Sequence, residues 1–393
     1  MRHSALRSAC LSTALGIGAL ALQAFPAQAS LYNVKNLVSD GIVPAVTIDP
    51  NLINPWGISY APTGPFWVSD NNAGVSTLYN GAGTKLGLTV AIPPPAGGSG
   101  AGTSSGQVFN GGTGFRVSSG GNTGVARFIF ATEDGTISGW SPGVDFTHAI
   151  LGVDNSASGA VYKGLAIGST GGASYLYAAN FNSGKLEQYD SNFNLVKSFT
   201  DPGVAAGYAP FNVQNLGGEL YVTFALQNGA KHDDVSGAGH GYVDVFNLDG
   251  TFNRRLVSLG GSINSPWGLD IAPSGFGTFA GDLLVGNFGD GTINAFDPVS
   301  GAFKGSVLGF NAQPIVLGDL WGIINGNGAN AGSKDSVYFA AGVLNEAHGL
   351  FGSITLVPEP ATWAFMLIGL GTVGAKLRRD RRGRREFRPL LIA

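Results

Sequence analysis

Residues 265–297, SPWGLDIAPSGFGTFAGDLLVGNFGDGTINAFD, contain three short apolar segments at 268–272, 282–287 and 292–296. Glycine-rich turns separate the segments, and apolar residues alternate with polar or small ones inside them. This pattern is typical of strands in an antiparallel meander. The same pattern begins near the start of the chain, where residues 54–80 read NPWGISYAPTGPFWVSDNNAGVSTLYN. Because the two copies lie far apart, the sequence predicts weaker copies between them.

Six such units can be recognised along the body of the chain. One residue in the first strand of each unit is taken as equivalent, namely Trp56, Phe115, Gly164, Asn212, Trp267 and Trp321. The spacings between these residues are 59, 49, 48, 55 and 54. Repeats of about fifty residues with three or four strands each predict an all-β, six-bladed β-propeller. A two-sheet sandwich rarely repeats a motif six times, and the turns of a β-helix are shorter.

The two ends of the repeat region predict how the ring closes. A blade of four twisted strands cannot cover its own faces, so each blade must pack on two neighbours. The last unit ends at residue 356, and residues 31–38 form an isolated strand pattern at the start. We therefore expect this N-terminal strand to complete the last blade. In the second unit, strands are expected at 114–117, 127–132 and 136–140, after a Pro/Gly/Ser-rich loop at 93–106.

The composition supports an all-β chain and excludes some partners. Glycine supplies 63 of 393 residues and charged residues only 12%, which suits short strands joined by tight turns. The net charge of −3 conceals an uneven distribution, since residues 30–357 hold 12 Lys/Arg and 22 Asp/Glu, a balance of −10. An acidic body argues against nucleic acid as a partner.

Residues 1–29 predict a secretory signal peptide. Arg2 and Arg7 precede an apolar run at 11–21, and an Ala-Gln-Ala exit follows at 27–29. A membrane anchor is the alternative, but the apolar run is too short to span a bilayer. The single cysteine, Cys10, lies in this segment, so the exported body would have no disulfide.

Residues 358–393 predict a second targeting segment. Pro358, Glu359 and Pro360 precede an uncharged, mostly apolar run at 361–375, and eight basic residues fall within 376–388. Fifteen helical residues reach about 22 Å, which is short for a bilayer core, while the basic cluster should stay cytoplasmic. The segment resembles the PEP-CTERM sorting signal of Gram-negative bacteria, apart from an additional tail at 387–393. The resemblance implies processing by an exosortase-type enzyme after transient anchoring in the inner membrane. A plain C-terminal anchor is the alternative.

The body, residues 30–357, also resembles a known group. The motifs NPWG at 54–57, SPWG at 265–268 and KHDDVSGAGHGYVDVF at 231–246 are similar to those of a family of exported bacterial propeller proteins. More distantly, the strand–turn–strand units resemble NHL repeats and six-bladed lactonases, although the Arg usual after the NHL turn is missing. These resemblances imply a fold and an export route but no particular activity.

Candidate binding residues lie at the starts of the inner strands and in one insertion. The first group is Asn54, Trp56, Asn212, Asn264, Trp267 and Trp321. Its Trp residues recur at equivalent places, which favours blade packing over ligand stacking. The insertion at 227–240 breaks the repeat and carries Lys231, His232, Asp233 and Asp234. Its His beside two carboxylates could be a metal ligand, a base or part of an ordered capping loop. The simpler interpretation is a solvated loop.

Two functions remain open at this point. No catalytic motif is present, so we expect a binding or structural module at the cell surface or in the extracellular matrix, with exopolysaccharide or surface proteins as partners. The alternative is a metal-dependent hydrolase or lactonase that uses Ca²⁺ or Zn²⁺ in the propeller channel. The turns at 70–72, 133–134, 180–182 and 287–290 contain Asp, Glu and Asn that could supply oxygen ligands. These residues also favour turns by bonding to their own backbone, and no spacing among them demands a metal.

Overall fold

The computed structural model describes residues 30–358 and residue 378. The predicted signal peptide and the apolar and basic parts of the predicted sorting segment, including Glu359 and Pro360, lie outside the described residues. Among the residues described, no helix has the length and apolar character needed to cross a membrane.

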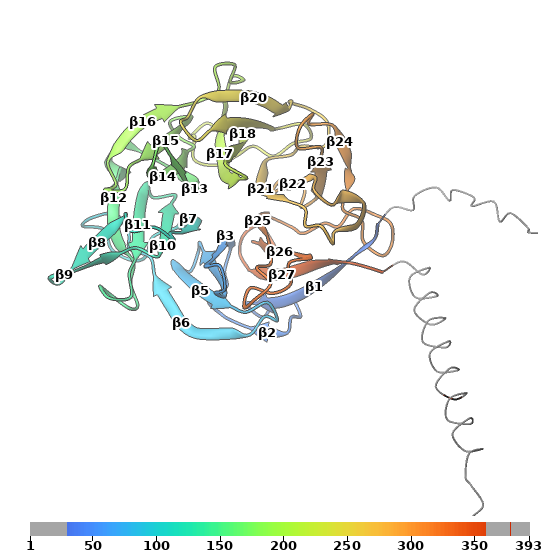
Figure 1. Ribbon diagram of the computed structural model, residues 1–393, viewed down its shortest axis with the longest axis horizontal. Coiled ribbons are helices and arrows are strands. Elements are labelled where there is room, and N and C mark those ends of the chain that lie inside the picture. Colours follow the sequence, from blue (N-terminus) through green and yellow to red (C-terminus); the bar gives the residue numbers. More distant parts are fainter. Residues whose placement is uncertain (1–29, 359–377, 379–393) are drawn as a thin grey trace, which may run out of the picture.

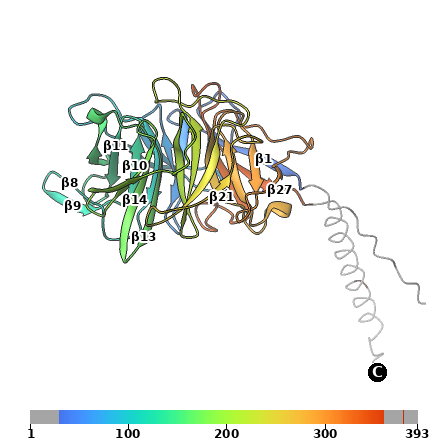
Figure 2. The same ribbon diagram turned by 90° about the horizontal axis from the view of Figure 1, so that it is seen from above.

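The described chain forms a ring of six blades, each a twisted antiparallel sheet (Figure 1). Seen from the side, the ring is a disc whose strands run between two rims (Figure 2). From inner to outer, blade 1 consists of β3 (Pro55–Tyr60), β4 (Phe66–Asp70), β5 (Val75–Tyr79) and β6 (Lys85–Ala91), and blade 2 of β7 (Ser104–Phe109), β10 (Phe128–Thr132), β11 (Thr136–Trp140) and β12 (Ile150–Asp154). In the same order, blade 3 consists of β13 (Tyr162–Thr170), β14 (Ala173–Asn180), β15 (Lys185–Tyr189) and β16 (Leu195–Phe199), and blade 4 of β17 (Tyr208–Leu216), β18 (Glu219–Leu226), β19 (Tyr242–Asn247) and β20 (Phe252–Val257). Blade 5 consists of β21 (Pro266–Ile271), β22 (Leu283–Asn287), β23 (Ile293–Phe296) and β24 (Phe303–Ser306), and blade 6 of β25 (Leu320–Asn325), β26 (Ser336–Ala341), β27 (Leu350–Leu356) and β1 (Tyr32–Ser39). Two short 3-10 helices, η1 (Ser156–Ser158) and η2 (Gly277–Phe279), lie in connecting loops.

The ring closes through the N-terminal strand, as the sequence predicted. β1 pairs antiparallel with β27 from Tyr32 opposite Leu356 to Ser39 opposite Leu350, and β2 (Thr47–Ile48) extends the sheet by pairing parallel to β1. The Tyr32 hydroxyl donates a hydrogen bond to the Phe276 carbonyl of the neighbouring blade at 2.8 Å. Blade 6 therefore joins the two ends of the described chain in one sheet.

In blade 2 the strands predicted at 127–132 and 136–140 are confirmed as β10 and β11, but the predicted inner strand was wrong. The segment expected to be its inner strand is instead part of a hairpin, β8 (Arg116–Ser119) and β9 (Asn122–Val125), inserted between β7 and β10. The inner strand β7 begins inside the segment expected to be a loop. Three of its side chains, Ser104, Ser105 and Gln107, are buried but polar. The Ser105 hydroxyl donates to the Tyr162 carbonyl at 2.6 Å, and Gln107 Nε2 donates to the Gly57 carbonyl at 2.9 Å. Because hydrogen bonds satisfy these groups, the strand needs no apolar alternation, which hid it in the sequence.

Small residues let the inner strands approach each other closely around the ring. A Cβ on Gly57 would lie 2.6 Å from the Ser105 carbonyl oxygen, and one on Gly322 would lie 2.5 Å from the Trp56 carbonyl oxygen. Blade 4 has Asn212 at this place, and its Nδ2 donates to the Trp267 carbonyl at 2.7 Å. The Gly of the repeated Trp-Gly pair is therefore a contact point between blades.

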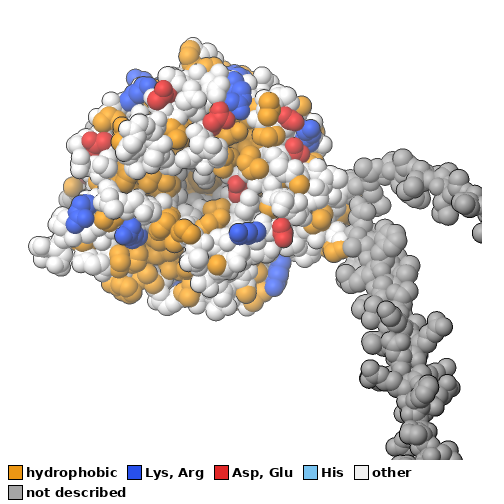
Figure 3. Space-filling view, in the orientation of Figure 1, with side chains coloured by type: hydrophobic (Ala, Val, Ile, Leu, Met, Phe, Trp, Pro, Cys, Tyr) orange, Lys and Arg blue, Asp and Glu red, His pale blue; other side chains and the backbone are white. Residues whose placement is uncertain are grey.

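The residues that precede these contact points fill the axis of the ring. Trp56 stacks on Trp321 with ring centroids 3.4 Å apart, and Trp267 meets both rings edge-on. These three indoles and Phe211 are at most 2% exposed and belong to one hydrophobic cluster. The cluster fills the channel along the axis and leaves an opening at each rim, and each opening is called a mouth below. One of them is hollowed and surrounded by hydrophobic side chains in the face shown in Figure 3.

Candidate binding site at one mouth of the channel

One rim gathers the beginning of each inner strand and the loop between the second and third strands. In every blade, the first residue of the loop between the second and third strands donates its backbone N–H to the carbonyl of a residue just before the inner strand. Examples are Asn71 to Asn54 at 3.1 Å and Glu133 to Thr103 at 3.0 Å. The side chains at this position differ, and they are Asn71, Glu133, Phe181, Gln227, Phe288 and Gly342. Five residue types thus occupy the six equivalent places around the mouth, because only Phe occurs twice.

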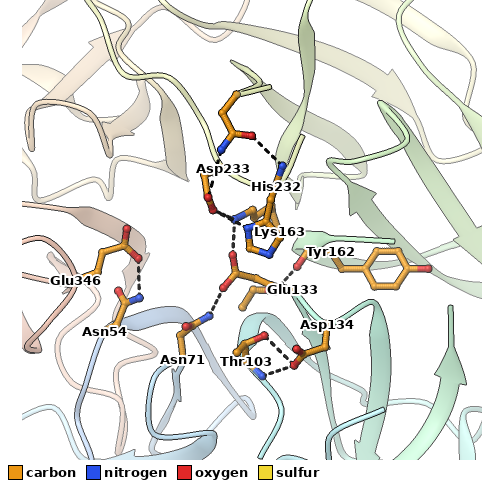
Figure 4. Close-up of polar contacts among 12 residues, drawn as sticks. Asn54, Asn71, Thr103, Glu133, Asp134, Tyr162, Lys163, His232, Asp233 and Glu346 are labelled. Atoms are coloured by element: carbon orange, nitrogen blue, oxygen red, sulfur yellow. Dashed lines mark hydrogen bonds and ion pairs between the residues drawn. The ribbon is translucent and has the colours of Figure 1, made fainter. Parts of the chain in front are cut away.

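An ion cluster forms where blades 2, 3 and 4 meet. Lys163 occupies the position of blade 3 where blades 1, 5 and 6 have Trp, and its side chain is only 2% exposed. Its Nζ contacts Glu133 Oε1 and lies 3.4 Å from Asp233 Oδ1 (Figure 4). The same ammonium lies 5.1 Å from the ring centroid of Trp56, a favourable cation–π distance.

Polar neighbours extend this cluster toward solvent. Asn71 Nδ2 donates to Glu133 Oε2 at 2.7 Å, and His232 Nδ1 lies 2.7 Å from Asp233 Oδ1 (Figure 4). Potential ligand atoms of Glu133, His232 and Asp233 all lie within 4.8 Å of one another. Sequence-distant side chains from three blades thereby converge on one small volume.

The charges in the cluster compensate each other. Burial alone would lower the pKa of Lys163, but Glu133 and Asp233 outweigh that effect and raise it. Burial would likewise raise the pKa of Asp233, yet the hydrogen bond from His232 and the charge of Lys163 hold it below its usual range. Lys163 is therefore a protonated, structural cation near neutral pH.

A second polar link borders the same mouth. Asn54 Nδ2 donates to Glu346 Oε2 at 2.7 Å (Figure 4). On its other side, Asn54 Oδ1 accepts a hydrogen bond from Trp321 Nε1 at 3.0 Å. Burial raises the pKa of Glu346 to about 7, although the bond from Asn54 works in the opposite direction. Asn54 has a φ of 48°, in the left-handed region that Asn tolerates better than other non-glycine residues.

The residues proposed from sequence fall into three groups. Asn54, His232 and Asp233 lie at the mouth, whereas the three Trp residues and Asn212 lie within the packed ring. Asn264 fastens the insertion, because its Oδ1 accepts the Gly237 N–H at 2.7 Å. Asp234 accepts a hydrogen bond from the Ser236 hydroxyl at 3.0 Å, and burial raises its pKa.

Sequence reasoning missed Lys163 and Glu346 of this mouth, and it named Asn71 and Glu133 only as turn residues that could supply oxygen ligands. One signal was available for Lys163. The pair Lys163-Gly164 stands in the register of Trp56-Gly57, so the third unit places a cation where three others place an indole. A charge in a buried position of a repeat requires a partner from elsewhere in the chain.

Comparison with known sequences defines the class of protein. Residues 356–382 match the PEP-CTERM protein-sorting motif, so the chain is an exported β-propeller protein that carries a C-terminal sorting signal of the kind processed by exosortases. Two Acanthamoeba polyphaga mimivirus proteins are similar over most of the body. Uncharacterized protein R648 is 33% identical over 82% of this chain and 80% of its own length, and uncharacterized protein L690 is 34% identical over 82% and 85%. The chain belongs to the family of these two proteins.

Comparison with solved structures supports the architecture alone. A glucose dehydrogenase superposes with a TM-score of 0.50 and 12% sequence identity, covering 83% of this chain and 99% of that one. At this identity the likeness extends to the propeller fold and carries no information on the residues at the mouth.

Proposed function

We propose that the protein is an exported binding module and that it holds a hydroxyl-rich polymer, such as exopolysaccharide, at the channel mouth that contains Lys163. The observation that carries the proposal is the convergence of Glu133, Lys163, Asp233 and His232 from three blades at a place where the repeat is broken. Residues that recur in several blades pack the ring, whereas the residues of this cluster have no equivalents in the other blades.

The exposed part of the cluster suits hydroxyl groups. The side chains of Asp233 and His232 are 61% and 47% exposed, so an acceptor and a ring nitrogen lie side by side at the surface. Phe288, which is only partly buried, stacks on Trp321 with centroids 4.1 Å apart. Its other face offers an apolar platform near polar groups, a combination that is common in ligand sites.

A metal-dependent hydrolase is the second candidate, and the spacing of Glu133, His232 and Asp233 favours it. Their oxygen and nitrogen atoms are suitable ligands for Zn²⁺. However, the Lys163 ammonium already contacts both carboxylates, so a metal ion would have to displace a cation that the fold has buried. Binding without metal is therefore the better supported function.

A polymer-binding assay tests the first proposal. Purified residues 30–358 would be applied to exopolysaccharide from the source organism and to a glycan array, beside the double variant H232A/D233A. Because both side chains are exposed, the variant should fold normally and lose at least tenfold in affinity. The matched control is D145A/H148A, which removes another exposed His–Asp pair. The proposal is wrong if the wild type binds neither the exopolysaccharide nor the glycan array, or if H232A/D233A binds polymer as tightly as D145A/H148A.

Metal analysis tests the second candidate separately. Elemental analysis of the purified protein, with thermal unfolding in added Zn²⁺ or Ca²⁺, should show no stoichiometric metal and no increase in Tm. A stoichiometric ion that disappears in H232A/D233A would favour the hydrolase instead.

A further inference from the structure

The opposite mouth of the channel contains a cavity of about 340 Å³. All six inner strands contribute to its lining, which includes Ile58, Ile167, Leu269 and Ile323 as apolar walls. Figures 1 and 4 view the ring from opposite sides, because the chain runs clockwise in Figure 1 and anticlockwise in Figure 4. Figure 3 has the orientation of Figure 1, so both show the rim opposite the ion cluster. The aromatic cluster on the axis separates this cavity from that mouth.

The cavity lining also contains polar side chains, among them Asp270, Asn325 and Ser59. Asp270 accepts the Ile271 N–H at 2.8 Å and the Asn325 N–H at 2.7 Å. Asn325 Oδ1 is buried without a hydrogen-bond partner, and so is the hydroxyl of Ser59, a residue only 7% exposed. Buried polar groups without a partner are costly, and two of them belong to residues of the cavity lining, on β3 and β25.

Unlike several other carboxylates of the ring, Asp270 has no cation beside it within the described residues. Asp49 pairs with Lys85 at 2.7 Å, Asp244 with Arg255 at 2.6 Å, and Glu133 with Lys163. Within residues 30–358, no Lys, Arg or His pairs with Asp270, and it is the single charged side chain that lines the cavity. The cavity lining therefore has one carboxylate and no basic side chain to neutralise it.

We propose that this cavity binds a small aliphatic ammonium ion. The ammonium group would donate hydrogen bonds to Asp270, and the alkyl part would lie against Ile58, Leu269 and Ile323. An apolar wall disfavours a hydrated metal ion, and the carboxylate disfavours an anion. This inference is independent of the proposed function, because the two sites lie at opposite mouths of the channel.

The state of Asp270 agrees with this geometry. Burial raises the pKa of its carboxyl to about 7, although the two backbone N–H groups work in the opposite direction. Its negative charge also contributes, after burial, to the raised pKa of Tyr60, which is about 12. A bound ammonium ion would favour the ionised form of Asp270 and lower its pKa.

The test uses n-butylammonium as the probe, with 1-butanol and butyrate as isosteric neutral and anionic controls. Titrations of isotope-labelled residues 30–358 would be followed by NMR at pH 8. The cation should shift resonances of β3, β21 and β25, bind at least tenfold more tightly than 1-butanol, and lower the pKa of Asp270 by at least one unit. Butyrate should not bind.

The variant D270N provides the matched control, because the amide oxygen keeps one of the two accepted hydrogen bonds and the side-chain volume. It should reduce butylammonium affinity at least tenfold and leave 1-butanol binding unchanged. D234N, near the other mouth, should change neither. The proposal is overturned if 1-butanol binds as well as the cation, if the Asp270 pKa stays constant in the wild type, or if Ca²⁺ alone shifts these resonances.

Discussion

The two mouths of the channel contain carboxylates in opposite electrostatic situations. At one mouth, Lys163 supplies a fixed positive charge to Glu133 and Asp233. At the other, Asp270 is held by two backbone N–H groups alone, and burial raises its pKa to about 7. The comparison shows that a ring of similar strands can hold carboxylates with a basic partner at one mouth and a carboxylate without one at the other. Single residues, Lys163 on β13 and Asp270 on β21, make the difference.

The largest effect is expected from removing the internal cation. K163M should lower the free energy of unfolding by about 3–5 kcal/mol, because it leaves a buried carboxylate without its partner. Urea unfolding would measure the change. The double variant E133Q/K163M should recover part of the loss, and K185M, on an exposed residue of β15, should change little. If K163M is as stable as the wild type, the ion cluster is not structural.

The next effect concerns the pH dependence of stability at the other mouth. Because the folded pKa of Asp270 is about 7 and its ordinary value about 3.9, the folded state retains a proton that the unfolded state has released. The contribution of this group to stability is therefore largest at low pH and declines between about pH 4 and 7. Relative to the wild type, D270N should gain roughly 2–4 kcal/mol between pH 4 and 8. Urea unfolding at several pH values measures this difference, and a constant difference would contradict the account.

A smaller effect is expected at the link between Asn54 and its two partners. N54A should cost about 1–3 kcal/mol, since it removes hydrogen bonds to Trp321 and Glu346. N54G loses the same bonds but tolerates the φ of 48°, so it should be less destabilised by about 1 kcal/mol. Equal stability of the two variants, measured by thermal unfolding, would show that backbone strain has no part in the effect.

The smallest effect is expected away from both mouths. The Asp145–His148 pair is exposed at the surface, and exposed ion pairs contribute little. D145A/H148A should therefore leave the Tm and both kinds of ligand binding unchanged. A clear loss of polymer binding in this variant would show that binding does not depend on the channel mouth.

Much of the fold could be predicted from sequence, because the repeated Trp-Gly pairs mark contact points between blades. The closing strand was also predictable, since residues 31–38 had no other partner in their own unit. The inner strand of blade 2 was not predictable from apolar periodicity, because Ser105 and Gln107 are buried through hydrogen bonds. The polar clusters were missed for a different reason: Glu133, Lys163 and Asp233 are distant in sequence and meet only when the ring is closed.

Direct measurement of the carboxyl pKa values at both mouths tests the central claim most directly. Residues 30–358 with ¹³C-labelled Asp and Glu would be titrated by NMR, with D270N and D233N used to assign the two signals. The account predicts that Asp270 titrates at about 7 and Asp233 below its usual range. If both titrate at the ordinary value, or in the reverse order, the contrast between the two mouths is wrong.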